Sequence, residues 1–239
     1  MRLALFVFLL SRSFLTYTQE FNVPAYFHKY AEKYPDYIVM KGSDKVKSIA
    51  LTFDDGPSDA TSRILNLLNE HQIKATFFWQ GTNLIQHPQT VKRAITEGHL
   101  LANHSWNHPN GNAMVPDALW NNQIAPTNKV YDSLYGVTIE YYRPPFGAIS
   151  EEQLIFLAKR NIATVLWSHS TLDWDGEMNT SEVMIDRFRK ELHSGAIALM
   201  HDVDFNNTLS EKLIALELMI EHGKSEGFQF VTIDKLNEL

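Results

Sequence analysis

From Val46 onward, short apolar runs alternate with segments whose apolar residues recur every three or four positions. Short apolar runs are typical of buried strands, and the longer spacing is typical of amphipathic helices. We expect strands at 48–53, 75–79, 100–102, 141–142, 163–167, 196–200 and 228–233, and helices at 61–70, 90–97, 117–134, 151–160, 181–192 and 210–226. Gly98 and Gly195 are expected to end two helices, and Pro126 to kink a third. The alternation predicts one α/β domain, a distorted (β/α) barrel of about seven parallel strands.

The first 45 residues do not share this pattern. Met1 and Arg2 precede a run of eight apolar residues, which is shorter than the ~20 residues of a membrane span but fits a secretory signal peptide. We expect a signal peptide over residues 1–18, with the cleavage site open between Ser13 and Thr18; an ordinary N-terminal strand or helix is the alternative. The protein would then be exported (secreted, periplasmic or at the cell surface), with no stable membrane span after cleavage. Residues 19–45 are expected to form an extension packed on a domain of residues 46–239.

Length, charge and cysteine content favour one globular domain and argue against several kinds of partner and chemistry. The chain has 239 residues, 44% of them hydrophobic, which is enough for one sizeable core. Its formal net charge is −7, which argues against nucleic acid or an anionic membrane surface as partner, because both bind basic faces. The absence of cysteine excludes disulfides, thiolate metal ligands and cysteine nucleophiles.

Ionisable side chains follow five of the expected strands. Asp54 and Asp55 come directly after the first strand. His104 and His108 follow the third strand at a spacing of four, which is a metal-chelating spacing. Three more such residues follow later strands: Arg143, Asp173 and His201. Each motif alone is explained by a solvated turn or a buried structural histidine. Because the carboxyl ends of parallel strands share one rim, together they predict a three-ligand metal site with acid–base partners.

These segments resemble, in order, the five motifs of the polysaccharide deacetylases, which are carbohydrate esterase family 4 or the NodB homology domain. The matching segments are TFDDGPS at 52–58, HSWNH at 104–108, RPPFG at 143–147, LDW at 172–174 and LMH at 199–201. The resemblance extends from about Val46 to the C-terminus. It implies a distorted (β/α) barrel and a metal-dependent hydrolase that removes N-acetyl groups, or occasionally an O-acetyl group, from an amino-sugar polysaccharide such as peptidoglycan or chitin.

The resemblance also implies roles for the residues nearest the metal. Asp55, His104 and His108 would bind one divalent ion, expected to be Zn²⁺. Asp54 would act as the general base that takes a proton from the attacking water. Arg143 would orient Asp54 and hold it ionised.

Further residues would handle the leaving group and the acetyl group. His201 would be the general acid that protonates the departing amine, and Asp173 would pair with it. Trp174 and Leu199 would line the acetyl pocket, and the backbone N–H of Phe146 would help stabilise the oxyanion.

Two positions leave alternatives open. The fourth motif usually begins with an aspartate three residues before the second one, and Ser170 stands there instead. If that aspartate supports the pocket, activity or substrate choice would differ from the family's. Trp79 follows the second strand and is interpreted as a core aromatic, with a wall of the site as the alternative.

Two other functions remain open at this point. One is a catalytically silent carbohydrate-binding protein of the same fold, which would bind sugar without releasing acetate. The other is a hydrolase of the same superfamily that acts on small cyclic amides or O-acetyl esters. Relative activity on acetylated xylan, purine-ring amides and chitin oligomers would separate that hydrolase from a polysaccharide N-deacetylase.

Overall fold

The computed structural model describes residues 25–176 and 179–236. The expected signal peptide at residues 1–18 lies outside these ranges. Within them, nine strands form one sheet, and every pairing is parallel. The strands are β1 (Ile38–Val39), β2 (Ser48–Asp54), β3 (Thr76–Trp79), β4 (Leu100–Asn103), β5 (Tyr141–Tyr142), β6 (Ala163–Val165), β7 (His169–Ser170), β8 (Ala196–His201) and β9 (Gln229–Phe230).

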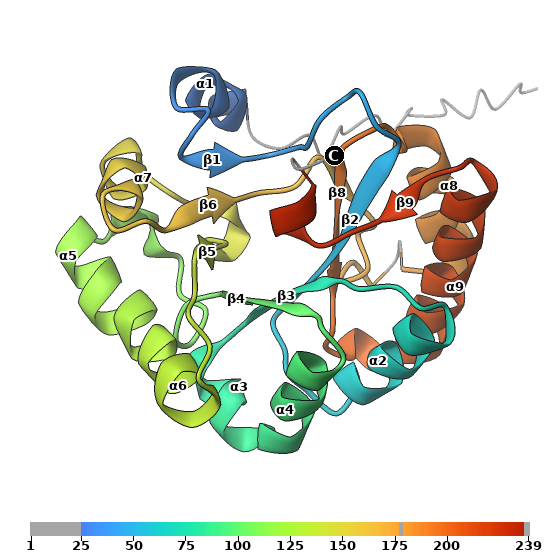
Figure 1. The fold of residues 1–239 in the computed structure, drawn as a ribbon, viewed down its shortest axis with the longest axis horizontal. Coiled ribbons are helices and arrows are strands. Elements are labelled where there is room, and N and C mark those ends of the chain that lie inside the picture. Colours follow the sequence, from blue (N-terminus) through green and yellow to red (C-terminus); the bar gives the residue numbers. More distant parts are fainter. Residues whose placement is uncertain (1–24, 177–178, 237–239) are drawn as a thin grey trace, which may run out of the picture.

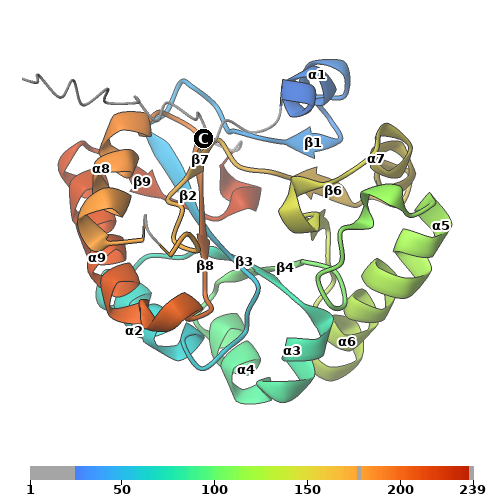
Figure 2. The same ribbon diagram turned by 180° about the vertical axis from the view of Figure 1, so that it is seen from behind.

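The sheet curls into a distorted half-barrel with its helices outside (Figures 1 and 2). Its strand order is β1-β6-β5-β4-β3-β2-β8-β7, with β9 paired to β2. In the described part of the chain no pairing joins β1 to β7, so hydrogen bonds do not close the barrel. The predicted fold class is confirmed, but the expected number of strands was two too low. The missing strands are β1 and β7: β1 lies in the segment before Val46, where the sequence has no periodic pattern, and β7 consists of the polar residues His169 and Ser170.

The helices form an outer layer around the strands (Figure 1). They are α1 (Ala25–Lys33), α2 (Thr61–Glu70), α3 (Gly81–Gln86), α4 (Pro88–Thr96), α5 (Pro116–Leu119), α6 (Ala125–Tyr135), α7 (Glu151–Ala158), α8 (Ser181–Glu191) and α9 (Leu209–Ser225). A π-helical segment, Trp120–Ile124, joins α5 to α6 just before Pro126. This irregular segment is the kink expected at Pro126. Proline has no N–H for the regular helical hydrogen bond, so the helix is interrupted next to it. No helix in the described ranges is long and apolar enough to cross a membrane.

The segment before Val46 contributes regular structure to the same body. In β1, Ile38 pairs with Thr164 of β6 at the edge of the sheet. Phe27 of α1 is fully buried in an apolar cluster that includes Leu154 of α7. Residues 25–45 therefore share a core with the barrel, and a domain boundary at Val46 stays a prediction.

Two central strands, β2 and β8, place candidate site residues next to each other. β2 is buried along its whole length, as expected for a strand covered on both faces. It pairs with β8 in a register that sets Asp54 opposite His201. On its other side it pairs with β3, with Asp54 opposite Phe78. The carboxyl ends of β2 and β8 are thus adjacent, which is where the functional side chains of such folds collect.

Candidate active site

A cleft of about 590 Å³ opens at the carboxyl ends of the strands. It is lined by Asp54, Asp55, His104, His108, Pro144, Phe146, Trp167, Trp174, Leu199, His201 and Phe205. All but two of the site residues expected from the sequence are in this lining. The two exceptions, Arg143 and Asp173, are fully buried behind it. The side chains gathered here come from segments more than 140 residues apart in the sequence, as the parallel topology predicts.

Asp55, His104 and His108 form a cluster with the composition of a metal site. One ligand atom from each lies within 4.8 Å of the other two. Asp55 Oδ1 is 3.2 Å from His108 Nε2 and 3.5 Å from His104 Nε2. Two imidazoles and one carboxylate leave a coordination position open for water or substrate, as in catalytic zinc sites.

Local backbone geometry aims these ligands at one another. Asp55 and His108 have positive φ angles of 76° and 60°, so the chain turns sharply at Asp55, directly after β2, and at His108, in the loop that follows β4. Gln80 donates a hydrogen bond of 2.9 Å to Asp55 Oδ1. The His108 amide donates to Ser105 Oγ at 2.9 Å, which fixes the turn between the two histidines.

The protonation states of the cluster suit a divalent cation. His104 Nδ1 lies 2.8 Å from the carbonyl oxygen of Arg143. A carbonyl can only accept, so Nδ1 carries the proton and Nε2 presents its lone pair to the cluster. Burial, and then the nearby His104, lower the pKa of His108. Burial opposes ionisation of Asp55, but the positive charge that His104, His201 and His108 carry when protonated outweighs it and lowers its pKa. A divalent cation bound by Asp55 would supply positive charge in the same way while the imidazoles are neutral. Neutral imidazoles and an ionised carboxylate are the forms that bind metal.

Asp54 lies beside this cluster and is paired with a buried guanidinium. Arg143 Nη1 donates to Asp54 Oδ1 at 2.7 Å and to Thr52 Oγ1 at 2.8 Å. Arg143 Nη2 donates to the carbonyl of Leu166 at 3.1 Å, and its guanidinium lies 4.0 Å from the centre of the Phe78 ring. The other oxygen, Asp54 Oδ2, is 3.8 Å from His104 Nε2. Arg143 therefore occupies one oxygen of Asp54 and leaves the other facing the cluster.

His201 also borders the cluster, at the end of β8 next to Asp54 of β2. Its Nδ1 donates to Asp173 Oδ1 at 2.8 Å, and its Nε2 is 4.0 Å from Asp55 Oδ2. Burial opposes protonation of His201, but the charge and hydrogen bond of Asp173 outweigh it and raise the pKa of the imidazole. Trp174 packs edge-on against the ring, with centroids 5.1 Å apart.

The substitution at Ser170 leaves this arrangement in place. Ser170 is buried in β7, and its Oγ accepts a hydrogen bond of 3.3 Å from the Leu172 amide. Thr171 donates from its hydroxyl to the carbonyl of Leu199 at 3.2 Å. The first bond lies within the loop and the second ties the loop to β8, so Asp173 reaches His201 without an aspartate at position 170.

Trp79 is a core aromatic and does not line the cleft. It is fully buried, and its indole N–H donates to Asp202 Oδ2 at 2.8 Å. Burial raises the pKa of Asp202 to about 7, against the opposing hydrogen bonds from Thr61 and Trp79. The Gly56 amide donates to Asp202 Oδ1 at 2.9 Å. A Cβ at Gly56 would lie 2.1 Å from Asp202 Oδ2, so only glycine allows this packing beside Asp55.

Sequence reasoning missed three residues at the site. Trp167 and Phe205 line the cleft from segments that carry no family motif. Lys212 is buried behind it and contacts Asp173. One signal for Lys212 was present, because it falls on the otherwise apolar face of α9 between Leu209 and Leu216. A lysine at such a position is rare unless it is paired.

The chain is similar to known proteins over most of its length. The family model for polysaccharide deacetylase matches residues 41–165. The peptidoglycan-N-acetylglucosamine deacetylase of Bacillus cereus is 36% identical, over 87% of this chain and 74% of that protein. The peptidoglycan-N-acetylmuramic acid deacetylase PdaA of Bacillus subtilis is 33% identical, over 86% of this chain and 76% of that protein. The crystal structure of the Bc1960 peptidoglycan N-acetylglucosamine deacetylase superposes with a TM-score of 0.80 at 33% identity, covering 88% of this chain and 96% of that one. The chain belongs to the polysaccharide deacetylase family, carbohydrate esterase family 4.

Proposed function

We propose that the protein is a zinc-dependent deacetylase that removes the N-acetyl group from N-acetylglucosamine in peptidoglycan. The observation that carries the proposal is the convergence of three groups on one cleft. The Asp54–Arg143 pair and the His201–Asp173 pair both border the cluster of Asp55, His104 and His108. Asp54 Oδ2 lies 3.8 Å from His104 Nε2, and His201 Nε2 lies 4.0 Å from Asp55 Oδ2. A relative named as a peptidoglycan-N-acetylglucosamine deacetylase, 36% identical over most of the chain, supports the choice of sugar.

The ligand set favours zinc among divalent ions. Two imidazole nitrogens and one carboxylate oxygen are typical ligands of catalytic zinc, whereas calcium and magnesium take oxygen ligands. When bound, such a metal supplies a Lewis acid that polarises a carbonyl and lowers the pKa of water towards ~7. The three side chains need little rearrangement to bind it, because their ligand atoms already converge.

Asp54 is assigned as the general base. Arg143 holds one of its oxygens at 2.7 Å, so the free oxygen is positioned to take a proton from the attacking water. The water oxygen adds to the acetamide carbonyl carbon. A positioned base of this kind contributes roughly 10²–10⁴ in rate.

His201 is assigned as the general acid. Its Nδ1 is committed to Asp173, so the proton on Nε2 faces the cleft and is available to the sugar nitrogen. When the carbon–nitrogen bond breaks, His201 gives this proton to the departing amine. The products are acetate and a glucosamine unit that keeps the free amine.

Aromatic side chains at the cleft are suited to a sugar. Phe146 is 64% exposed and packs edge-on against His108, with centroids 4.7 Å apart. Trp174 lines the cleft next to His201, and the buried Leu199 also lines it. We assign Trp174 and Leu199 to the acetyl pocket and the Phe146 backbone N–H to the oxyanion. The exposed Phe146 ring offers an apolar face to the rest of the polymer.

A peptidoglycan substrate implies that the protein works outside the cytoplasm. The signal peptide expected at residues 1–18 fits this location. Its test is the mass of the mature chain after export, which would show whether cleavage follows Ser13 or Thr18.

The function is tested by incubating the zinc-loaded protein with peptidoglycan, digesting the product with a muramidase and sequencing the muropeptides by tandem mass spectrometry. The proposal predicts loss of acetyl from the glucosamine unit, with an equal amount of free acetate. Loss confined to the muramic acid unit would contradict the choice of sugar. Binding without acetate release would favour the silent carbohydrate-binding protein. Higher turnover on acetylated xylan or purine-ring amides would favour the other hydrolases.

A further inference from the structure

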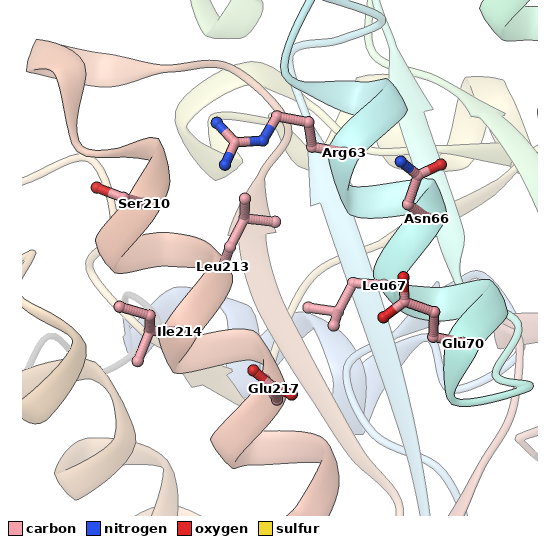
Figure 3. A pocket seen from close by; sticks show the side chains of 8 residues that line it. All are labelled: Arg63, Asn66, Leu67, Glu70, Ser210, Leu213, Ile214 and Glu217. Carbon is pink, nitrogen blue, oxygen red and sulfur yellow. The ribbon is translucent and has the colours of Figure 1, made fainter.

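Lys212 is a cation that is fully buried behind the cleft. It stands on α9, whose neighbouring residues Leu213 and Ile214 face an outer groove between α9 and α2 (Figure 3). Lys212 itself lies on the helix face that packs into the core, together with Leu216. Burying an ammonium group is costly unless charged and polar partners surround it. The residues that contact Lys212 should therefore indicate its role.

Two of the three polar contacts of Lys212 are with the Asp173–His201 pair. Its Nζ is 2.8 Å from Asp173 Oδ2, and it donates to the carbonyls of His201 and Val203 at 2.7 Å each. An ammonium group has three hydrogens, so these three acceptors use all of them. Lys212 therefore ties the Asp173 carboxylate to the end of β8 that carries His201.

Both oxygens of the Asp173 carboxylate have partners. Oδ1 accepts from His201 Nδ1 at 2.8 Å, and Oδ2 accepts from the His201 amide, also at 2.8 Å. Lys212 adds a charged contact to Oδ2. With both oxygens engaged, Asp173 cannot rotate away from the imidazole without breaking a charge-assisted hydrogen bond.

We infer that Lys212 is a positioning residue for proton donation by His201, acting through the Asp173 carboxylate. The inference rests on the proposed function, in which His201 protonates the departing amine. Once His201 has given up its proton, the buried Asp173 would lack a cationic partner if Lys212 were absent. Lys212 gives no proton to the substrate and keeps its contact with Oδ2, so the carboxylate keeps a partner and its orientation for the next turnover. Lys212 does not line the cleft itself, so its effect on the substrate passes through its contacts. Of these, Phe205, whose ring centroid is 5.3 Å from Nζ, lines the cleft but has no ionisable proton, which leaves the Asp173–His201 pair as the route to proton donation.

A comparison of two leaving groups tests this role. An amide needs its nitrogen protonated as it departs, whereas 4-nitrophenyl acetate releases a stable phenolate that needs no acid. Lys212→Met keeps a long unbranched side chain without the charge. We expect it to lower kcat on a chitin oligomer by about 10²-fold, with KM and bound zinc unchanged, since a general acid contributes roughly 10²–10⁴. On 4-nitrophenyl acetate kcat should stay within about threefold of wild type, because acid catalysis is not used there.

The control is Lys224→Met, an exposed lysine on the same helix whose Nζ donates to the His71 carbonyl. It should change neither rate. If Lys212→Met fails to fold, Lys212→Arg replaces it, because a guanidinium keeps the charge but not the compact three-way contact, and the same amide-specific loss is expected. In an Asp173→Asn background, removing Lys212 should cause little further loss on the amide.

Three results would overturn the inference: an equal loss on amide and ester, no loss on the amide, or losses from Lys212 and Asp173 that multiply independently. A wild-type protein with no amide turnover at all would overturn the proposed function instead.

Discussion

The pairing of His201 with Asp173 makes a quantitative prediction about pH. Asp173 is fully buried, and its Oδ1 lies 2.8 Å from His201 Nδ1. Burial alone would lower the pKa of the imidazole, but this carboxylate outweighs burial and raises it. Asp173→Asn keeps the shape of the side chain and removes its charge. The imidazolium should then lose its main stabilising partner.

The size of the effect follows from the strength of the bond. A hydrogen bond to a charged group is worth about 1.5–3 kcal/mol, and one pKa unit corresponds to about 1.36 kcal/mol. The pKa of His201 should therefore fall by about one to two units in the variant. Because the acid works only when protonated, activity is lost as pH rises through this pKa. The basic limb of the pH profile should move to lower pH by the same one to two units.

The assay is kcat/KM against pH on one soluble N-acetylglucosamine oligomer, for wild type and Asp173→Asn at equal zinc content. The control is Asp204→Asn, which makes the same charge change at an exposed carboxylate that accepts a hydrogen bond from the Leu209 amide. Its basic limb should not move. An unshifted basic limb in Asp173→Asn would mean that Asp173 does not tune His201, or that His201 is not the acid.

Three further changes test other parts of the site. Asp54→Asn should keep zinc but lower kcat by roughly 10²–10⁴, because an amide cannot take up the proton of water; more than about a tenth of wild-type kcat would refute the assignment of the base. The His104→Ala, His108→Ala double variant should lose zinc by elemental analysis, and full retention would place the metal elsewhere. Arg143→Met leaves the Asp54 carboxylate buried without its cation and should lower the free energy of unfolding by about 3–5 kcal/mol; urea denaturation of the metal-free protein measures it, and a loss below about 1 kcal/mol would contradict this account of the buried pair.

The sequence could predict those parts of the fold that produce a local pattern. For example, the apolar run that begins at Ser48 predicts β2, and it ends where Asp54 and Asp55 begin. The strand is buried throughout, while its carboxyl end meets the cleft. The short strands β1 and β7 stand outside any such pattern, and only their pairing with β6 and β8 identifies them as strands. The strand order and register depend on packing between distant segments, which no local pattern contains.

The candidate site divides in a similar way. Residues in the contiguous motifs could be predicted to lie at the cleft, because each motif lies at or after the end of an expected strand. Lys212 could not, because its partner Asp173 is 39 positions away in the sequence and only the packing of α9 against the β8 end brings them together. The sequence also could not predict whether Asp173 still reaches His201 with Ser170 in place of the family's aspartate. That depends on hydrogen bonds donated by Thr171 and Leu172, which a motif does not encode.

The central claim is that a metal held by Asp55, His104 and His108 is required to release acetate from peptidoglycan. Its most direct test is a zinc titration of the metal-free protein, with bound zinc and acetate released from peptidoglycan measured in the same samples. The account predicts that acetate release rises in proportion to bound zinc and levels off at about one ion per chain, as expected for a single three-ligand site. Acetate release by the metal-free protein, or full zinc occupancy without acetate release, would contradict it.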